Sequence, residues 1–402
     1  MRRMLAPLVV ALVLVVSGAG ATASPVKPSA DAALDAIRSA SAAAESDALL
    51  VIHDGRVLVD TASDTGQRPI ELMSATKSVV ALGVGLLLMD GALESLDTPV
   101  HTFFPEWAQG RKRDITVRML LDHTSGLQNS PNAGEEIYPA PDAVQLALAA
   151  ELSSTPGEVF AYNNKATNLL AGVIGKAAGQ PMDVYLNARL FQPLGIVPGP
   201  WYRDASGQPH SMAGLPLSAH DAAKLGQLLL DDGLAPDGNR LLPEGYVQAL
   251  YAAGPRSPRV GLLWWRIPAW QFLTVREDAI AAARARDADP RWIAALESLR
   301  GQRLDGTAGL RTAMADALGD DWPALYAAQT SALGLGRSDV FDEDTGPVVA
   351  YSAKGFLGQY IVVVPDTRLV AVRQIRRRDT PHTPAMDHAA FPSQIVALAS
   401  AL

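Results

Sequence analysis

Residues 71–93 have the sequence ELMSATKSVVALGVGLLLMDGAL, in which a small polar group opens an otherwise apolar segment. The apolar run predicts a helix over residues 72–89, which ends at Asp90-Gly91 because glycine suits a helix C-cap. Ser74 and Lys77 lie three residues apart, so they share one face of this helix. A hydroxyl and an amine are therefore expected side by side at the helix start.

The apolar residues that follow Lys77 are expected to surround its amine. Burial of this kind lowers the pKa of a lysine, so the neutral amine can take a proton from a serine hydroxyl near pH 7. Free N–H groups at a helix start also favour negative charge at Ser74. The pattern predicts a nucleophile, Ser74, with Lys77 as its base. The alternative is a helix-capping serine with a lysine that extends to solvent.

A second Ser-x-x-Lys runs from Ser24 to Lys27, so the spacing alone is not specific. Ser24 is followed by a proline and lies in a short Pro/Ser-rich linker, with no apolar helix after it. We interpret this second match as a chance occurrence.

The first 23 residues have the features of a secretory signal peptide. Arg2 and Arg3 form the charged start, residues 5–16 form a short apolar core, and Ala21-Thr22-Ala23 resembles a cleavage site. The alternative is a retained anchor, but the apolar run is short for a membrane span. We expect an exported bacterial protein, periplasmic or secreted, without a stable membrane span once the signal is removed.

Length and charge narrow the classes of partner. The 402 residues suggest two domains or one large composite domain. Removal of residues 1–23 takes away two arginines and no acidic residue, which leaves 32 basic against 42 acidic residues and a net charge of −10. This argues against nucleic acid or an anionic membrane surface as a partner. The chain has no cysteine, which excludes disulfides and thiolate chemistry.

Predicted strands lie near both ends of the chain. Two apolar runs around Asp54-Gly55 predict a β-hairpin over 48–53 and 56–60. Later strands are expected at 260–266, 359–364 and 369–375. We expect the N- and C-terminal strands to share one antiparallel sheet that terminal helices cover, with a helical middle inserted. The helices are expected at 31–44, 144–152, 167–178, 183–190, 219–230 and 385–402, and residues 270–335 are also expected to be helical.

Further motifs follow the serine–lysine pair in a fixed order. Residues 115–127 are ITVRMLLDHTSGL, residues 156–170 are PGEVFAYNNKATNLL, and residues 355–360 are GFLGQY. As a set, and in this order, they resemble the serine β-lactamase-related superfamily over about residues 49–375. Gly-Gln-Tyr at the end of the last motif, and Gly-Leu-Leu-Trp-Trp at 261–265, resemble its 6-aminohexanoate-dimer hydrolase and carboxylesterase branch.

The resemblance implies an α/β (α+β) fold of the β-lactamase/transpeptidase type, an antiparallel sheet flanked by helices plus an inserted all-helical domain. It divides the chain into a sheet part, residues 24–115 and 255–402, and a mostly helical part, residues 116–254. The segment at about 270–335 does not match the family core and is expected to be a helical insertion. It could form a lid, a partner surface or a structural addition.

The resemblance also implies roles for individual residues. Ser74 matches the acylated nucleophile and Lys77 the lysine that hydrogen-bonds it. Tyr162 matches a general base for acylation and acid for the leaving group. Asn164 matches an asparagine that holds the lysine or a substrate amide. The remaining site residues are the backbone of Gly355 and Phe356, where the N–H of Phe356 pairs with that of Ser74 as an oxyanion hole. The segment at 123–126 matches a landmark that we interpret as structural.

One departure from the family pattern concerns the third motif, which is Ala353-Lys354-Gly355 where β-lactamases carry Lys-Thr-Gly. A shift of one residue on a strand moves a side chain to the opposite face. Lys354 is therefore either a substrate contact or a solvated strand residue. The loss of the cation at position 353 weakens the expectation of β-lactam carboxylate binding.

The sequence therefore favours an exported serine hydrolase that acts on carboxylic esters or small amides. A true β-lactamase or D-amino-acid peptidase is an alternative, and a non-catalytic sensor of penicillin or peptidoglycan fragments is another. No His-Glu-x-x-His, clustered His/Asp or phosphate-loop pattern is present, so we expect no metal and no cofactor. Of Trp264 and Trp265, which alternate faces on the predicted strand, one is expected in the core and one in a cleft.

Overall fold

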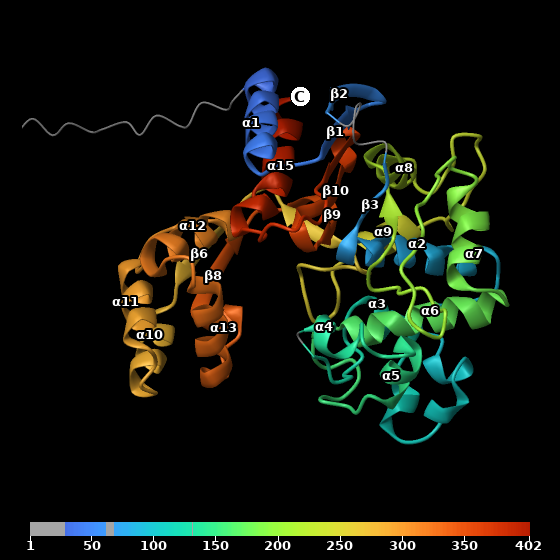
Figure 1. Cartoon of the computed structure of the whole chain (residues 1–402), viewed down its shortest axis with the longest axis horizontal. Helices are drawn as coiled ribbons and strands as arrows, with labels where there is room; N and C mark the ends of the chain where they lie inside the picture. The colour runs from blue at the N-terminus through green and yellow to red at the C-terminus, as the bar shows by residue number, and fades with distance from the viewer. Residues whose placement is uncertain (1–28, 62–67, 131) are drawn as a thin grey trace, which may run out of the picture.

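A computed structural model describes residues 29–61, 68–130 and 132–402 of the chain (Figure 1). The predicted signal peptide and the second Ser-x-x-Lys at Ser24–Lys27 lie outside these described residues. Within the described ranges, no helix is both long enough and apolar enough to cross a lipid bilayer.

The central sheet has six antiparallel strands in the order β2-β1-β11-β10-β9-β5. The hairpin and the two C-terminal strands are confirmed, and β1 pairs directly with β11, so the two ends of the chain share one sheet as predicted. Asp54 and Gly55 both have positive φ, as a tight hairpin turn requires. The strands are β1 (Ala48–His53), β2 (Arg56–Asp60), β11 (Leu369–Gln374), β10 (Gln359–Val364), β9 (Val348–Gly355) and β5 (Trp265–Pro268).

Helices cover both faces of this sheet. On one face, α1 (Ala30–Ala43) and α15 (Phe391–Ala401) lie side by side and bury Leu49 and Val51 of β1 (Figure 1). On the other face, Leu50 packs in a second cluster with α2 (Thr76–Met89) and α8 (Ala219–Leu230). The alternation along β1 is the period of two that a strand imposes on its side chains.

Helix α2 occupies the centre of the molecule, between the sheet and the helical part. All but its last two residues are buried, which explains why the segment is apolar on every side. The helical part comprises α3 (Val117–Leu121), α4 (Ala133–Glu136), α5 (Ala143–Ala149), α6 (Asn164–Ala178), α7 (Met182–Leu186) and α9 (Tyr246–Tyr251), with a small sheet of β3 (Ile70–Glu71) and β4 (Pro216–Leu217). The division of the chain at residue 254 stays a prediction.

The insertion at 270–335 is not entirely helical, which corrects the sequence-based expectation. Strand β6 lies between β7 and β8 in a second, three-stranded antiparallel sheet with its own apolar core. Figure 1 shows this unit projecting away from the central sheet. Its elements are β6 (Gln271–Val275), α10 (Glu277–Ala285), α11 (Pro290–Ser298), β7 (Leu304–Asp305), α12 (Gly306–Leu318), α13 (Trp322–Leu333), α14 (Arg337–Val340) and β8 (Phe341–Thr345).

Two predicted boundaries are also wrong. The strand expected at 260–266 begins only at Trp265, because Leu263 has a φ of 59° and breaks the extended backbone. The last helix begins at Phe391 and not at 385, since residues 384–387 form a 3₁₀ turn and His388 has a positive φ.

Candidate active site

Ser74 lies in a short 3₁₀ turn, η1 (Met73–Ala75), that leads directly into α2. Met73 has a φ of 49°, a left-handed conformation that costs a non-glycine residue free energy. Its side chain is buried against Leu357, Ile375 and Met386, which holds the strained backbone in place. Ser74 itself is half-buried at the start of the helix.

Lys77 is buried and reaches back to Ser74 along the helix face. Its Nζ lies 3.0 Å from Ser74 Oγ and 2.7 Å from the backbone oxygen of Met212. Burial lowers the pKa of Lys77, while the charge of Tyr162 and a hydrogen bond with it act in the opposite direction. A neutral amine donates one hydrogen to the Met212 carbonyl and has its lone pair available for the Ser74 hydroxyl.

Tyr162 completes the group that the sequence predicted. Its ring centroid lies 5.0 Å from Lys77 Nζ, 4.6 Å from the His123 ring and 6.4 Å from the Trp265 ring. The tyrosine is half-buried just before α6, and Asn129 Nδ2 donates to its backbone oxygen at 3.2 Å. The nucleophile, lysine and tyrosine therefore come together from segments almost 90 residues apart in the chain.

A narrow cavity of about 10 Å³ joins these side chains. Trp265 lines it whereas Trp264 is buried in the core, so the predicted placement of one tryptophan in the core and one in a cleft is confirmed, although Trp264 precedes β5. The cavity is small enough to hold little more than one water-sized sphere in this conformation. Its lining residues are Ser74, Lys77, Ser78, His123, Tyr162, Val260, Leu263 and Trp265.

Sequence reasoning assigned residues 123–126 a structural role and so missed His123 as a cavity residue. Its Nδ1 accepts a hydrogen bond from the backbone N–H of Asn163 at 3.2 Å, so the ring proton of the neutral form lies on Nε2. Burial and the nearby charge of Lys77 lower the pKa of His123 to about 3. No pattern in the sequence indicates that this ring meets Tyr162.

The buried neutral His123 makes the stability of the protein dependent on pH. Since its pKa falls from 6.5 to about 3 on folding, the unfolded chain binds the extra proton below pH 6.5. The titration of His123 does not change the free energy of unfolding above pH 6.5. As the pH falls from 6.5 toward 3, it lowers that free energy by at most about 1.4 kcal/mol per pH unit. The dependence of the free energy of unfolding on pH is expected to weaken in His123→Asn, whose amide oxygen can still accept a hydrogen bond from the Asn163 N–H.

Urea denaturation at pH 5 and pH 7 measures this difference for both proteins. Some slope is expected to remain in the variant, because burial also lowers the pKa of His210 and His388. An identical pH dependence in the wild type and His123→Asn would contradict the assignment.

The two asparagines after Tyr162 have different surroundings. Asn163 caps α6 through the N–H of Ala166 and donates to the Leu127 carbonyl at 2.6 Å. Asn164 is the first residue of α6, and its Oδ1 is buried without a hydrogen-bond partner among the described residues. Besides Ser74 Oγ, Lys77 binds the backbone oxygen of Met212, 135 residues away, which sequence reasoning missed. The role of Asn164 toward a substrate stays a prediction.

Gly355 brings the end of β9 against the backbone that precedes Ser74. A Cβ at this position would lie 2.2 Å from the carbonyl oxygen of Leu72, so only glycine allows the approach. The following residue, Phe356, directs its ring to the surface, where it lies 5.8 Å from His382. The backbone of Phe356 thereby follows a residue that contacts Leu72 and Met73, and its oxyanion role stays a prediction.

The third motif offers no cation at position 353. Ala353 is fully buried in the cluster that contains α2, whereas Lys354 is exposed and pairs across the sheet with Tyr360. Lys354 Nζ lies 6.0 Å from the Trp265 ring, outside the residues that line the Ser74 cavity. A contact between Lys354 and substrate stays a prediction.

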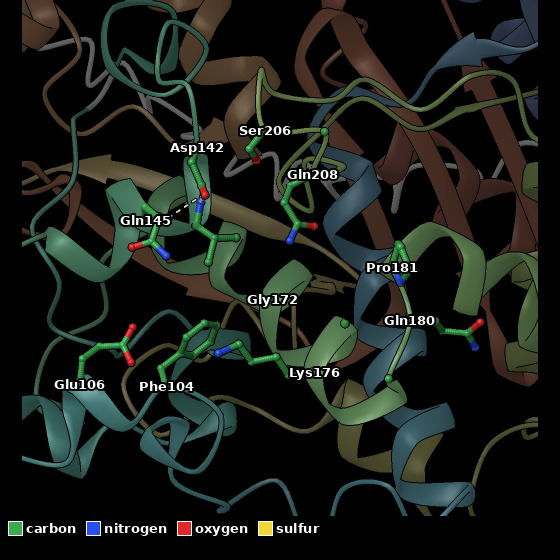
Figure 2. A pocket seen from close by; sticks show the side chains of 14 residues that line it. Phe104, Glu106, Asp142, Gln145, Gly172, Lys176, Gln180, Pro181, Ser206 and Gln208 are labelled. Carbon is green, nitrogen blue, oxygen red and sulfur yellow. Dashed lines mark hydrogen bonds between the residues drawn. The ribbon is translucent and has the colours of Figure 1, made fainter.

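A larger cavity of about 630 Å³ lies beside α6 and shares no lining residue with the Ser74 cavity (Figure 2). Two of its charged groups are engaged in the fold: Asp142 caps α5, and Lys176 donates to the Phe103 carbonyl at 2.8 Å above the Phe104 ring. This cavity has no paired nucleophile and base. Within the described residues, no group of three or more His, Asp or Glu side chains could hold a metal ion.

Comparison with known proteins agrees with this geometry. The family model described as Beta-lactamase matches residues 34–391. This chain belongs to the beta-lactamase family. Esterase EstB of Burkholderia gladioli is 31% identical over 144 residues, which cover 31% of this chain and 36% of the esterase. The 6-aminohexanoate-dimer hydrolase of Paenarthrobacter ureafaciens is 27% identical over 239 residues, covering 52% of this chain and 58% of the hydrolase. The chain thus matches less than two thirds of either relative's own length.

Solved structures of the family confirm the predicted fold. The class C beta-lactamase from Rhodobacter sphaeroides superposes with a TM-score of 0.53 at 18% identity, over 91% of this chain and 97% of that chain. A penicillin-binding protein homologue from Caulobacter crescentus superposes with a TM-score of 0.56 at 17% identity, with the same coverage. The antiparallel sheet flanked by helices is therefore the β-lactamase-like fold that the sequence predicted.

Proposed function

We propose that this protein is a serine hydrolase that cleaves carboxylic esters or small amides through an acyl-enzyme on Ser74. The observation that carries the proposal is the contact of 3.0 Å between the Ser74 hydroxyl and the buried amine of Lys77, whose pKa burial lowers. Tyr162 lines the same cavity. A hydroxyl, a neutral base and a second proton carrier are the groups that acyl transfer needs.

The proposed reaction has two halves. Ser74 Oγ attacks the substrate carbonyl, and its proton passes through Lys77 and Tyr162 to the leaving alcohol or amine as the bond to the carbonyl carbon breaks. Water then attacks the acyl carbon and gives a proton to the same base. The bond between the acyl carbon and Ser74 Oγ breaks, the carboxylic acid leaves, and Oγ takes up the proton to restore the hydroxyl. In both halves, the backbone N–H groups of Ser74 and Phe356 stabilise the negative charge on the carbonyl oxygen, a contribution often worth about 3 kcal/mol per donor.

The proposed substrate class rests on position 353. A buried alanine provides no positive charge for a substrate carboxylate next to the nucleophile, and this favours esters or small amides over β-lactams. The names of the two relatives, an esterase and a hydrolase of a 6-aminohexanoate dimer, support the same classes. We also propose that the protein is exported, on the basis of the signal-like residues 1–23.

The experiment gives the chain without residues 1–23 a short-chain p-nitrophenyl ester and, separately, a chromogenic cephalosporin. Turnover is followed by absorbance, and intact-mass spectrometry with peptide mapping detects an acyl group on Ser74. We expect ester turnover through an adduct at Ser74, with much slower cleavage of the cephalosporin.

The other outcomes identify the alternatives. Rapid cephalosporin turnover would indicate a β-lactamase in which another cation replaces the missing one. A stable cephalosporin adduct on Ser74 without turnover would indicate a sensor. If neither the ester nor the cephalosporin acylates Ser74, the proposed function is wrong.

A further inference from the structure

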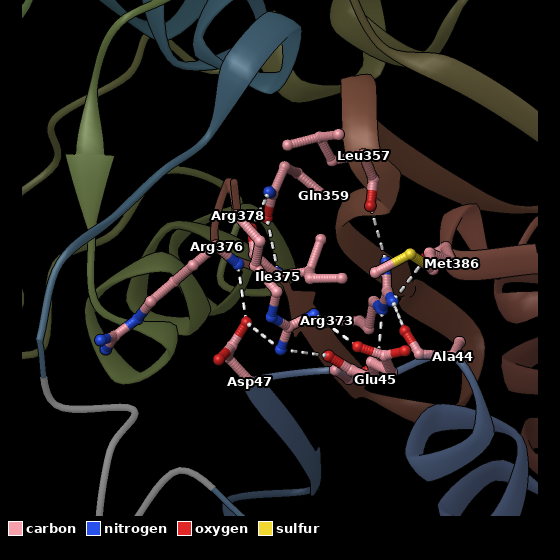
Figure 3. Close-up of polar contacts among 11 residues, drawn as sticks. Ala44, Glu45, Asp47, Leu357, Gln359, Arg373, Ile375, Arg376, Arg378 and Met386 are labelled. Atoms are coloured by element: carbon pink, nitrogen blue, oxygen red, sulfur yellow. Dashed lines mark hydrogen bonds and ion pairs between the residues drawn. The ribbon is translucent and has the colours of Figure 1, made fainter. Parts of the chain in front are cut away.

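Arg373 on β11 is a fully buried arginine in the interior of the protein. Its guanidinium makes five hydrogen bonds of 2.7–2.9 Å, and all five acceptors are neutral oxygens. Figure 3 shows the bonds to Ala44, Leu357 and Met386. An arginine has five N–H donors, so this side chain is fully satisfied without a direct carboxylate partner. The acceptors are Ser46 Oγ and the backbone oxygens of Ala44, Leu357, Gly358 and Met386.

These acceptors come from three segments that are far apart in the sequence. Ala44 and Ser46 follow helix α1, Met386 lies in the 3₁₀ turn before α15, and Leu357 and Gly358 form the turn after Phe356. Burial lowers the pKa of Arg373 to about 10, so its guanidinium keeps its charge at neutral pH. Hydrogen bonds from a charged donor are roughly twice as strong as neutral ones.

The turn that Arg373 holds has an unfavourable backbone conformation. Leu357 has a φ of 67° and Gly358 a φ of 78°, and the carbonyls of both residues accept from the same nitrogen, Nη1. A Cβ on Gly358 would lie 2.2 Å from that nitrogen, which shows how closely the turn packs on the guanidinium. These two bonds stabilise a turn in which Leu357 has a left-handed conformation that costs a non-glycine residue free energy.

The same turn adjoins the nucleophile. The Leu357 side chain packs on Met73, whose strained backbone precedes Ser74. Ser74 directly follows Met73 in the chain, and Phe356 directly precedes Leu357. The two residues whose N–H groups are the expected oxyanion donors are therefore next to this buried contact. Arg373 supports the contact between Leu357 and Met73 through its hydrogen bonds to the carbonyls of Leu357 and Gly358.

We propose that Arg373 is a positioning residue that holds the Phe356 N–H in line with the Ser74 N–H. It acts through the Leu357 and Gly358 carbonyls and does not touch the substrate. This inference rests on the proposed function. Because an oxyanion donor acts on the transition state, a misplaced Phe356 N–H lowers kcat and leaves ground-state binding unchanged.

The test compares Arg373→Met and Arg373→Lys with Arg368→Met, all in the chain without residues 1–23. Arg368 precedes β11 near the surface, where it pairs with Asp54 and Asp231, so its replacement controls for the loss of an arginine. In Arg373→Met we expect kcat for a p-nitrophenyl ester to fall about 100-fold with KM within about threefold. Arg373→Lys is expected to recover part of the loss, since lysine keeps the charge but has three donors.

Two further readouts separate positioning from general support of the fold. A boronic acid that forms a tetrahedral adduct on Ser74 is expected to bind the Met variant more weakly, in parallel with the loss of kcat. The pH dependence of kcat/KM is expected to stay unchanged, because Lys77 and Tyr162 are not altered. Arg368→Met is expected to keep kcat within twofold of the wild type.

A folded Arg373→Met that keeps kcat and boronate affinity within twofold of the wild type would overturn the proposal. So would a joint change of kcat, KM and the pH profile, since that indicates a general effect on the fold. If the Met variant does not fold, Arg373→Lys decides: reduced kcat at constant KM supports the proposal and unchanged kcat refutes it. Failure of the proposed function is distinguishable, because it appears as absence of acylation in the wild type itself.

Discussion

Ser74→Ala is expected to reduce ester turnover at least ~10⁴-fold, the scale at which nucleophile removal acts in serine hydrolases. The substitution deletes one oxygen that points into the cavity and leaves α2 and its buried faces intact. Without Oγ no acyl-enzyme can form, so only the hydrolysis promoted by the oxyanion donors remains. Absorbance measures the turnover of a p-nitrophenyl ester, and intact-mass spectrometry measures the acyl adduct. The adduct is expected to vanish together with the turnover.

Ser78→Ala provides a matched control one helical turn away. Ser78 lines the same cavity, but its hydroxyl donates to the Leu263 carbonyl at 2.6 Å. Its loss leaves a buried carbonyl without that donor and is expected to cost about 1 kcal/mol of folding stability. Turnover is expected to change less than about tenfold. The nucleophile assignment fails if a pure sample of Ser74→Ala retains more than about one per cent of wild-type turnover.

Lys77→Met is expected to lower kcat/KM for the same ester by about 10²–10⁴-fold, the usual contribution of a positioned base. Methionine matches the length of lysine and is apolar, so it fits the buried site without the cost of burying an amine. The wild-type rate is expected to rise with pH as Lys77 loses its proton, at a pH below the ordinary lysine value of 10.5 because burial lowers its pKa. This limb of the pH–rate profile is expected to be absent in the variant.

Lys165→Met is the corresponding control for a second buried lysine. Lys165 forms an ion pair of 2.6 Å with Glu136 and is not among the residues that line the Ser74 cavity. Its replacement leaves a partly buried carboxylate without its partner, so stability is expected to fall while turnover stays within about tenfold. Equal losses of activity in the two variants, or an unchanged pH profile in Lys77→Met, would contradict the role of Lys77 as the base.

The amino-acid sequence by itself determined the elements whose signals are local. The Asp54-Gly55 turn between two apolar runs predicted β1 and β2 with their observed bounds, and the strand at 359–364 was equally clear. The polar start of a fully apolar helix identified Ser74 and Lys77, because residues three apart on a helix must meet. The order of short motifs added Tyr162, although no spacing rule brings it to the cavity.

Strand β6 was missed because its local signal is short. Its five residues, QFLTV, lie next to alanine-rich helices whose composition dominates the segment. Whether such a run forms a strand depends on its partners, and both β7 and β8 lie at least 29 residues further along the chain.

Only the tertiary structure decided which distant groups surround the nucleophile. Met212 binds Lys77 through a backbone oxygen, which any residue type could supply, so its identity carries no signal. His123 meets Tyr162 because both lie on loops whose path the packing of α3 and α6 sets. Arg373 resembles any strand residue in the sequence, yet it joins three segments through carbonyls. Contacts made by backbone atoms over long sequence separations leave no pattern in side-chain order, and for this physical reason the folded chain alone reveals them.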